Sequence, residues 1–294
     1  SPGLAGYALR RDLDEVAALG RPAHRGEEGL IVNIWLSILA AWCVMAVIMA
    51  LLWLRQRATH NAGVVDVAWS FGAGLCAVWF AYAADGDVVR RIIIASMAGI
   101  WGLRLGLHLL RRVAREEEDG RYQQLREKWG DRTQRNLFIF FQVQAVWAVL
   151  FALPMLVAAR NDAPAWQWYD FAAIGVWLIA MIGEGVADAQ LAAFRRDAST
   201  KGQVCRRGLW KYSRHPNYFF EWVHWWTYVL LGFAGPYGYL TLGGPALMLF
   251  FLLRVTGIPP TEQRALASRG EAYREYQRTT SAFFPWPPKR SAEA

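Results

Sequence analysis

The chain contains apolar runs that are too long and too free of charge for the surface of a soluble domain. Residues 30–54 and 222–253 contain no Asp, Glu, Lys or Arg, and a helix of about 20 apolar residues is enough to cross a hydrocarbon layer about 30 Å thick. Hydrophobic residues make up 55% of the chain and charged residues 19%, whereas soluble domains average roughly 25% charged. The sequence therefore predicts an all-α, polytopic bundle of membrane helices.

Seven membrane helices are predicted. Gly235-Pro236 and Gly243-Gly244-Pro245 divide the last apolar run into two helices around a turn. Of the Lys and Arg residues, 24 lie in segments 55–65, 111–135, 195–214 and 254–294, and 7 lie in the segments that alternate with them. Because positive loops face the cytoplasm, the N-terminus is expected outside and the C-terminus inside. The seven spans are 30–54, 62–84, 92–110, 136–159, 171–193 and the two halves of 222–253.

Two parts of the chain are distinguished. Residues 1–29 form a polar N-terminal extension without the apolar core of a signal peptide. Residues 30–290 form one seven-helix membrane domain, whose cofactor half covers about 90–290. The stretch Gly72-Ala-Gly74-Leu-Cys-Ala77 resembles a dinucleotide loop, but it lies inside an apolar span and indicates close helix packing instead.

Charge and cysteine content exclude several classes of protein. The net charge is +8, but the basic residues lie between apolar runs, so no nucleic-acid partner is expected. Cys43, Cys76 and Cys205 are far apart and form no CxxC pair, which argues against a disulfide framework or a zinc site. No metal site is expected, and no protein partner is implied.

Several ionisable groups occur at membrane depth, where each costs a few kcal/mol unless it has a partner or a function. At about 100° per residue, these groups form one polar stripe on each of three helices. The stripes are Trp101, Arg104, His108, Arg112 and Arg115; Glu184, Asp188, Leu191 and Arg195; and Asn217, Glu221, His224 and Tyr228. A buried structural ion pair between Arg104 and Asp66, Glu184 or Asp188 is the alternative interpretation.

The stripes suit an anionic nucleotide that enters from the cytoplasm. Arginines at the mouth would bind phosphates in bidentate fashion, and carboxylates and Asn217 deeper in would hydrogen-bond ribose hydroxyls and an amide. The 2′-phosphate of NADP would increase the demand for arginine.

The segment Gly208-Leu-Trp-Lys-Tyr-Ser-Arg-His-Pro-Asn-Tyr-Phe-Phe-Glu221 is similar to the signature of the steroid 5α-reductase family, in its bacterial branch of uncharacterised members. Asp66-Val-Ala-Trp69, Trp101-Gly-Leu-Arg-Leu105, Glu118-Asp-Gly-Arg-Tyr122 and the tail motif Glu262…Tyr273-Arg-Glu-Tyr276 also resemble that branch. The likeness runs in order from about residue 60 to 288.

The resemblance implies a seven-helix reductase of the bacterial inner membrane, with NADPH in a cavity that opens to the cytoplasm. It implies cofactor contacts from Arg104, Arg112, Arg115, Glu184, Asp188, Arg195, Trp210, Arg214, His215, Asn217, Tyr218, Glu221, Glu262 and Tyr276. Glu184 stands where the family has Asn. Trp101 stands at the position of a substrate-binding Tyr, so steroid specificity is not inherited.

The expected reaction is reduction of a carbon–carbon double bond conjugated to a carbonyl, in an apolar lipid or steroid-like substrate from the bilayer. A hydrogen-bond donor must meet the negative charge that develops on the carbonyl oxygen. An Asp66 carboxyl kept protonated by its apolar surroundings is expected to act with Trp101, supported by Tyr228, with His224 as a further candidate.

A second enzyme class shares part of the pattern. Isoprenylcysteine carboxyl methyltransferases resemble the chain at Arg214–Tyr218, Glu262, Tyr273 and Tyr276. S-adenosylmethionine is cationic and lacks phosphates, so its pocket needs fewer arginines. The arginines of 92–110 and the stripe of Glu184, Asp188 and Arg195 favour the reductase. A transporter is disfavoured because no inverted repeat is present.

Overall fold

The computed structural model describes residues 27–115 and 118–289, and the predicted extension 1–29 lies almost wholly outside them. All regular elements in these residues are helices. They are α2 (Glu27–Thr59), α3 (Val64–Ala83), α4 (Val88–Arg115), α5 (Gly120–Trp129), α6 (Thr133–Ala158), α7 (Trp168–Arg196), α8 (Pro216–Leu231), α9 (Gly243–Phe250), α10 (Ile258–Arg269) and α11 (Glu271–Thr279), with short 3-10 and π turns between some of them.

Among residues 27–115 and 118–289, six helical segments are long and apolar enough to cross a membrane. The protein is therefore an integral membrane protein, as its composition predicts. Five of these segments overlap the first five predicted spans. The sixth is Gly238–Arg269, and a turn precedes it at 232–237. Helix α8, which covers the first half of the last predicted apolar run, is apolar but only 16 residues long, so the predicted count of seven is not confirmed.

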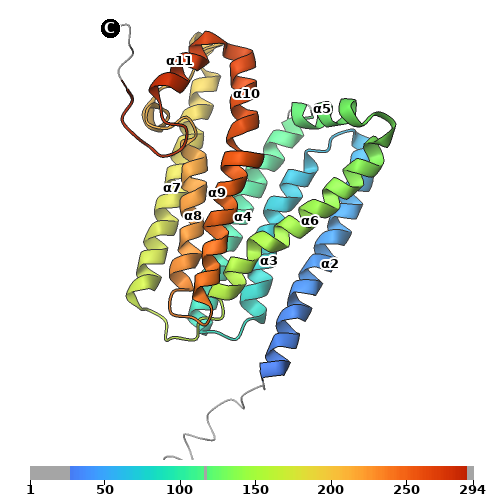
Figure 1. Cartoon of the computed structure of the whole chain (residues 1–294), viewed down its shortest axis with the longest axis vertical. Helices are drawn as coiled ribbons and strands as arrows, with labels where there is room; N and C mark the ends of the chain where they lie inside the picture. Colours follow the sequence, from blue (N-terminus) through green and yellow to red (C-terminus); the bar gives the residue numbers. More distant parts are fainter. Residues whose placement is uncertain (1–26, 116–117, 290–294) are drawn as a thin grey trace, which may run out of the picture.

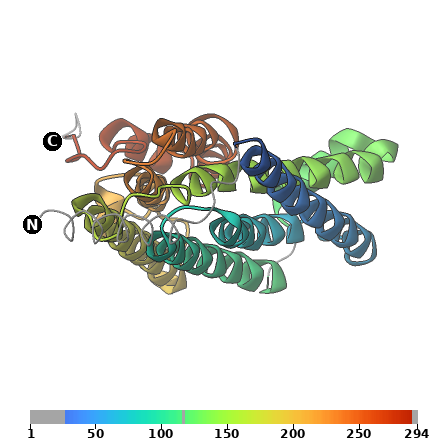
Figure 2. The same cartoon turned by 90° about the horizontal axis from the view of Figure 1, so that it is seen from below.

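The helices run up and down through one bundle (Figure 1), with α2 and α7 on opposite sides of it (Figure 2). The end of α4, helix α5, the start of α8 and helices α10 and α11 lie together at one end of the bundle. The segments with most Lys and Arg residues are thereby gathered at that end.

Small residues let α3 and α4 approach at their backbones. A Cβ atom at Gly102 would lie 2.9 Å from Gly74 Cα and 3.0 Å from the carbonyl oxygen of Ser70, and one at Gly72 would clash with Met45. Only glycine fits such contacts. The interpretation of Gly72–Ala77 as a helix-packing sequence agrees with this arrangement.

An ion pair joins α4 to α7 at the opposite end of the bundle. Arg90 Nε and Nη2 donate to the two carboxylate oxygens of Asp170 at 2.8 and 2.9 Å, and both side chains are fully buried. Arg90 also donates to the carbonyl oxygens of Asn161, Ala163 and Pro164. The sequence predicted Arg90 in a loop, but this residue lies in the first turn of α4. Its hydrogen bonds hold the 159–167 connection against the bundle.

Candidate functional site

Side chains from α4, α7 and α8 meet between these three helices in what we term the inner cluster. Arg104 of α4 is ion-paired with Glu184 of α7, and its Nη1 lies 3.8 Å from Asp188 Oδ2. Asn217 Nδ2, at the start of α8, donates to Asp188 Oδ1 at 3.2 Å. The inner cluster consists of Trp101, Arg104, Glu184, Asp188, Asn217, Glu221, His224 and Tyr228.

Aromatic side chains form the deeper part of the inner cluster. Trp101 Nε1 donates to Glu221 Oε2 at 3.0 Å, and its ring stacks on that of His224 at 5.2 Å between centroids. Tyr228 Oη lies 3.1 Å from His224 Nε2. All four side chains are buried. Eight residues of the three predicted polar stripes therefore converge on one place between the helices, whereas His108, Arg115 and Arg195 are exposed and Arg112 pairs with Asp119.

The inner cluster contains the buried ion pair that was the alternative interpretation of Arg104, formed with Glu184 and Asp188. Its polar atoms are nevertheless not all paired. Arg104 Nε, His224 Nδ1 and, one turn along α8, Thr227 Oγ1 are buried and have no hydrogen-bond partner among the described residues. Since buried polar groups are nearly always satisfied, these atoms leave hydrogen-bonding capacity in the inner cluster that side chains of the described residues do not use.

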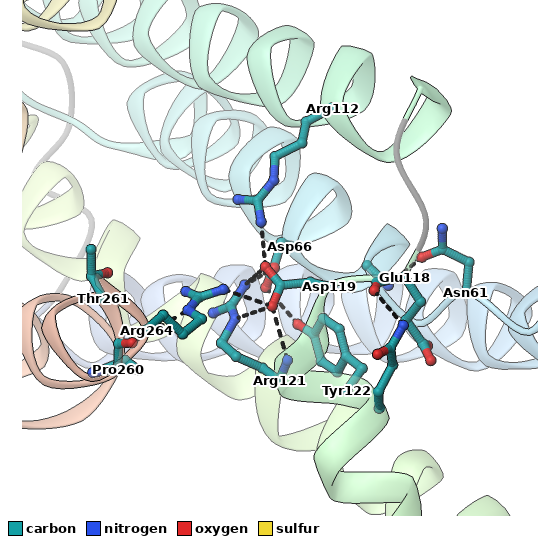
Figure 3. A network of polar contacts seen from close by, with 12 residues as sticks. Asn61, Asp66, Arg112, Glu118, Asp119, Arg121, Tyr122, Pro260, Thr261 and Arg264 are labelled. Atoms are coloured by element: carbon teal, nitrogen blue, oxygen red, sulfur yellow. Dashed lines mark hydrogen bonds and ion pairs between the residues drawn. The ribbon is translucent and has the colours of Figure 1, made fainter. Parts of the chain in front are cut away.

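Asp66 and Arg112 belong to a separate group around α5, which Figure 3 shows. Asp66 accepts hydrogen bonds from Arg121 Nη2 and Tyr122 Oη, both at 2.9 Å. Both carboxylate oxygens are thus occupied as acceptors. Asp66 makes its polar contacts here and not with Trp101, His224 or Tyr228, because α3 presents it to α5 and not to α8.

Asp119 is the centre of this α5 cluster, defined as Asp66, Arg112, Asp119, Arg121, Tyr122 and Arg264 (Figure 3). Its carboxylate is ion-paired with Arg112 of α4, with Arg121 of α5, and with Arg264 of α10 at 3.1 Å. Burial opposes ionisation of Asp119, but the hydrogen bonds and charge of Arg121 and the charge of Arg264 outweigh it and hold its pKa well below the ordinary value. The α5 cluster therefore ties α3, α4, α5 and α10 together electrostatically.

A third group, the C-terminal cluster, joins the start of α8 to α10 and α11. Arg214 Nε donates to Glu262 Oε1 at 2.6 Å, and His215 Nε2 lies 3.3 Å from the same oxygen. Tyr218 Oη lies 3.2 Å from the hydroxyl of Thr261. Burial lowers the pKa of His215, and Glu262 partly opposes this effect. The cluster consists of Trp210, Arg214, His215, Tyr218, Glu262, Tyr273 and Tyr276.

Hydrogen bonds from Tyr276 and Trp210 to backbone carbonyl oxygens complete the C-terminal cluster. Tyr276 Oη donates to the carbonyl oxygens of Trp210 and Ser213, and burial raises the pKa of Tyr276. Trp210 Nε1 donates to the carbonyl oxygen of Ala187 at 2.9 Å, which anchors this region to α7. Six residues predicted to contact a cofactor thus lie together here, next to the inner cluster along α7 and α8.

The remaining predicted residues, Arg115 and Arg195, are exposed in the last turns of α4 and α7. The contacts of Asp119, Arg121, Tyr122 and Arg264 within the α5 cluster were not predicted from the sequence. The motif Glu118–Tyr122 was a signal for the first three, since it is a dense set of charges beside an apolar span. Among the described residues, no group of three or more His, Cys, Asp or Glu side chains is placed to hold a metal ion, and none was expected.

The fold and its buried clusters define a polytopic helical membrane protein with a polar centre between α4, α7 and α8. The chain belongs to a family described as "Protein of unknown function (DUF1295)", whose model matches residues 52–280. It is also similar to the uncharacterised protein C594.04c of Schizosaccharomyces pombe, with 24% identity over 269 residues, covering 80% of this chain and 75% of the relative. No solved structure matches the chain significantly.

Proposed function

We propose that the protein is a membrane-embedded, NADPH-dependent reductase of carbon–carbon double bonds conjugated to a carbonyl, acting on an apolar, lipid or steroid-like substrate. The observation that supports this proposal is the convergence of eight predicted site residues into the inner cluster, where the buried atoms Arg104 Nε and His224 Nδ1 have no hydrogen-bond partner in the part of the chain that the structure describes. Ionisable groups inside a membrane bundle are functional by default because their burial is costly.

The gathering of the basic segments at one end of the bundle supports an orientation with the N-terminus outside and the C-terminus in the cytoplasm. We propose that α8 is a seventh crossing, since it runs alongside α7 and returns the chain before Gly238–Arg269. An odd number of crossings puts the N-terminus outside and gathers the basic segments in the cytoplasm of a bacterial cell. Arg115 and Arg195 would then meet cofactor phosphates at the cytoplasmic mouth of the inner cluster, and the C-terminal cluster would lie beside them.

The residues of the inner cluster suit the chemistry. When bound, NADPH supplies a hydride to the substrate and is left with a positively charged ring. The inner cluster contains three carboxyl groups and one guanidinium, so its charge favours that positive product. Glu184, Asp188 and Asn217 have the acceptors and donors that ribose hydroxyls and a carboxamide require.

Tyr228 is the proposed donor to the substrate carbonyl. His224 Nε2, at 3.1 Å, can accept the tyrosine proton or return one to the phenol oxygen, depending on the tautomer. Trp101 is assigned a positioning role, because its N–H is already engaged by Glu221 and its ring holds that of His224. Asp66 is assigned to the α5 cluster, where it acts as an acceptor.

The test combines a binding and an activity measurement on the purified protein. NADPH fluorescence titration is expected to show binding that Arg104→Ala weakens at least about tenfold, as loss of one charge-assisted contact predicts. Arg135→Ala, which removes an exposed arginine of α6, is the matched control. Tyr228→Phe is expected to keep NADPH affinity but lower enone-dependent NADPH oxidation about 10²- to 10³-fold, whereas Tyr239→Phe, at a residue 68% exposed, should have no effect. Absence of NADPH binding by the unmodified protein would refute the proposal.

A second function is favoured by one specific observation. The excess of carboxyl groups in the inner cluster also suits the cationic sulfonium of S-adenosylmethionine, and the C-terminal cluster contains the residues shared with the methyltransferases. Calorimetry with both cofactors separates the two functions. Tight binding of S-adenosylmethionine without an NADPH signal would assign the protein as a membrane methyltransferase.

A further inference from the structure

A hollow beside α11 gathers positive charge away from the inner cluster. It has a volume of about 470 Å³, and its lining includes Arg206, Lys211, Glu275, Thr279 and Lys289. Arg278 donates to Glu275 at 2.7 Å and balances its charge. The lining therefore presents three cations, from Arg206, Lys211 and Lys289, to whatever occupies the hollow.

The walls of the hollow are held in place by hydrogen bonds. Arg206 Nη2 donates to the carbonyl oxygen of Ala272 at 3.0 Å, and its guanidinium lies over the ring of Tyr276 at 5.5 Å. The backbone N–H of Lys289 donates to the carbonyl oxygen of Thr279 at 2.8 Å, which fixes the C-terminal segment alongside α11. These hydrogen bonds fix the positions of the walls, so the hollow has a defined shape.

The segment that forms one wall also contacts the first two turns of α8. The ring of Phe284 lies 6.0 Å from that of Phe219 and 5.7 Å from that of Trp222, in the first two turns of α8. The backbone N–H of Trp286 donates to the carbonyl oxygen of Tyr212 at 2.9 Å. The exposed fractions of Trp286, Phe284 and Tyr212 are 70%, 55% and 41%.

Exposed aromatic side chains beside cationic ones are typical of the boundary between headgroups and acyl chains. Helix α11, which lines the hollow, lies at the end of the bundle where the basic segments gather (Figure 1). Basic pockets at this depth and on this side of a membrane protein match the phosphate of an anionic lipid.

We propose that this hollow binds the phosphate-bearing headgroup of an anionic phospholipid of the surrounding membrane. Arg206, Lys211 and Lys289 contact the phosphate, and the acyl chains lie along Phe284, Trp286 and the outer face of α8. The site is separate from the inner cluster and does not depend on the reductase proposal.

The test measures lipid retention by the detergent-purified full chain with native mass spectrometry, using phosphatidylglycerol and phosphatidylcholine with the same acyl chains. Phosphatidylglycerol is expected to bind more tightly. The double variant Lys211→Ala/Lys289→Ala is expected to weaken it about 30-fold, or about fivefold for each lysine near the membrane surface. Lys211→Arg/Lys289→Arg, which keeps both charges, should retain the binding.

The matched control is Lys128→Ala/Lys201→Ala, which removes two exposed lysines outside the hollow's lining. This variant should bind phosphatidylglycerol like the unmodified chain. Equal losses in the two alanine variants would overturn the proposal, as would equal affinity for the two lipids. Complete displacement of phosphatidylglycerol by millimolar inorganic phosphate would show a site for soluble anions and would also overturn it.

Discussion

The fully buried pair of Arg90 and Asp170 permits a quantitative prediction about stability. Asp170→Asn keeps the volume of the side chain but removes its charge, which leaves the Arg90 guanidinium buried without a counter-ion. Breaking a buried ion pair from one side typically costs about 3–5 kcal/mol. We expect the free energy of unfolding to fall by that amount, because three backbone carbonyls hold Arg90 in place and prevent it from reaching water.

The measurement is unfolding in mixed micelles with increasing dodecyl sulfate, followed by the fluorescence of the 16 tryptophans. Asp85→Asn is the matched control, since it breaks the ion pair of Arg160 and Asp85 at 3.4 Å, with side chains 21% and 45% exposed. Exposed pairs contribute about 0–1 kcal/mol. The double variant Arg90→Met/Asp170→Leu should lower the free energy of unfolding by at least about 1 kcal/mol less than the sum of the losses in its two single variants. The stability changes of residues in contact are not additive. If Asp170→Asn and Asp85→Asn destabilise equally, the reasoning is wrong.

Three further outcomes are expected. Gly102→Ala should destabilise the protein by about 1–3 kcal/mol through overpacking, whereas Gly99→Ala should not, because its Cβ would meet only Val78 at 3.5 Å; equal losses in the same unfolding assay would contradict the close approach of α3 and α4. The pKa of His215 is lower in the folded protein than its ordinary value of 6.5, so the unfolded chain protonates this imidazole at a higher pH than the folded chain does. The free energy of unfolding should therefore be fully present above pH 6.5 and decline as the pH falls below it. His215→Phe should remove part of this decline, and an unchanged pH profile would refute the assignment. The lowered pKa of Asp119 adds a loss of stability that begins only as the pH falls through 3.8, the ordinary value for Asp, and Asp119→Asn should abolish that loss in the same titration.

The approximate positions of the first five membrane helices followed from the sequence, because these depend on local patterns. An uncharged apolar run must form a helix in a membrane, since every backbone polar group has to be satisfied within it. A polar stripe on such a helix must face the interior, since lipid solvates it poorly. The convergence of Trp101, Arg104, Glu184, Asp188, Asn217, Glu221, His224 and Tyr228 was therefore predictable as a tendency of three separate helices.

The tertiary structure alone decided which of these groups are partners. Trp101 and Glu221 are 120 residues apart, and Asp119 and Arg264 are 145 apart, and no local pattern couples such positions. Asp66 was expected to act with Trp101 on the substrate carbonyl. The packing of α3 instead turns it to Arg121 and Tyr122. Helical periodicity determines the face on which a charge lies, but the angle and register at which helices pack determine its counter-ion.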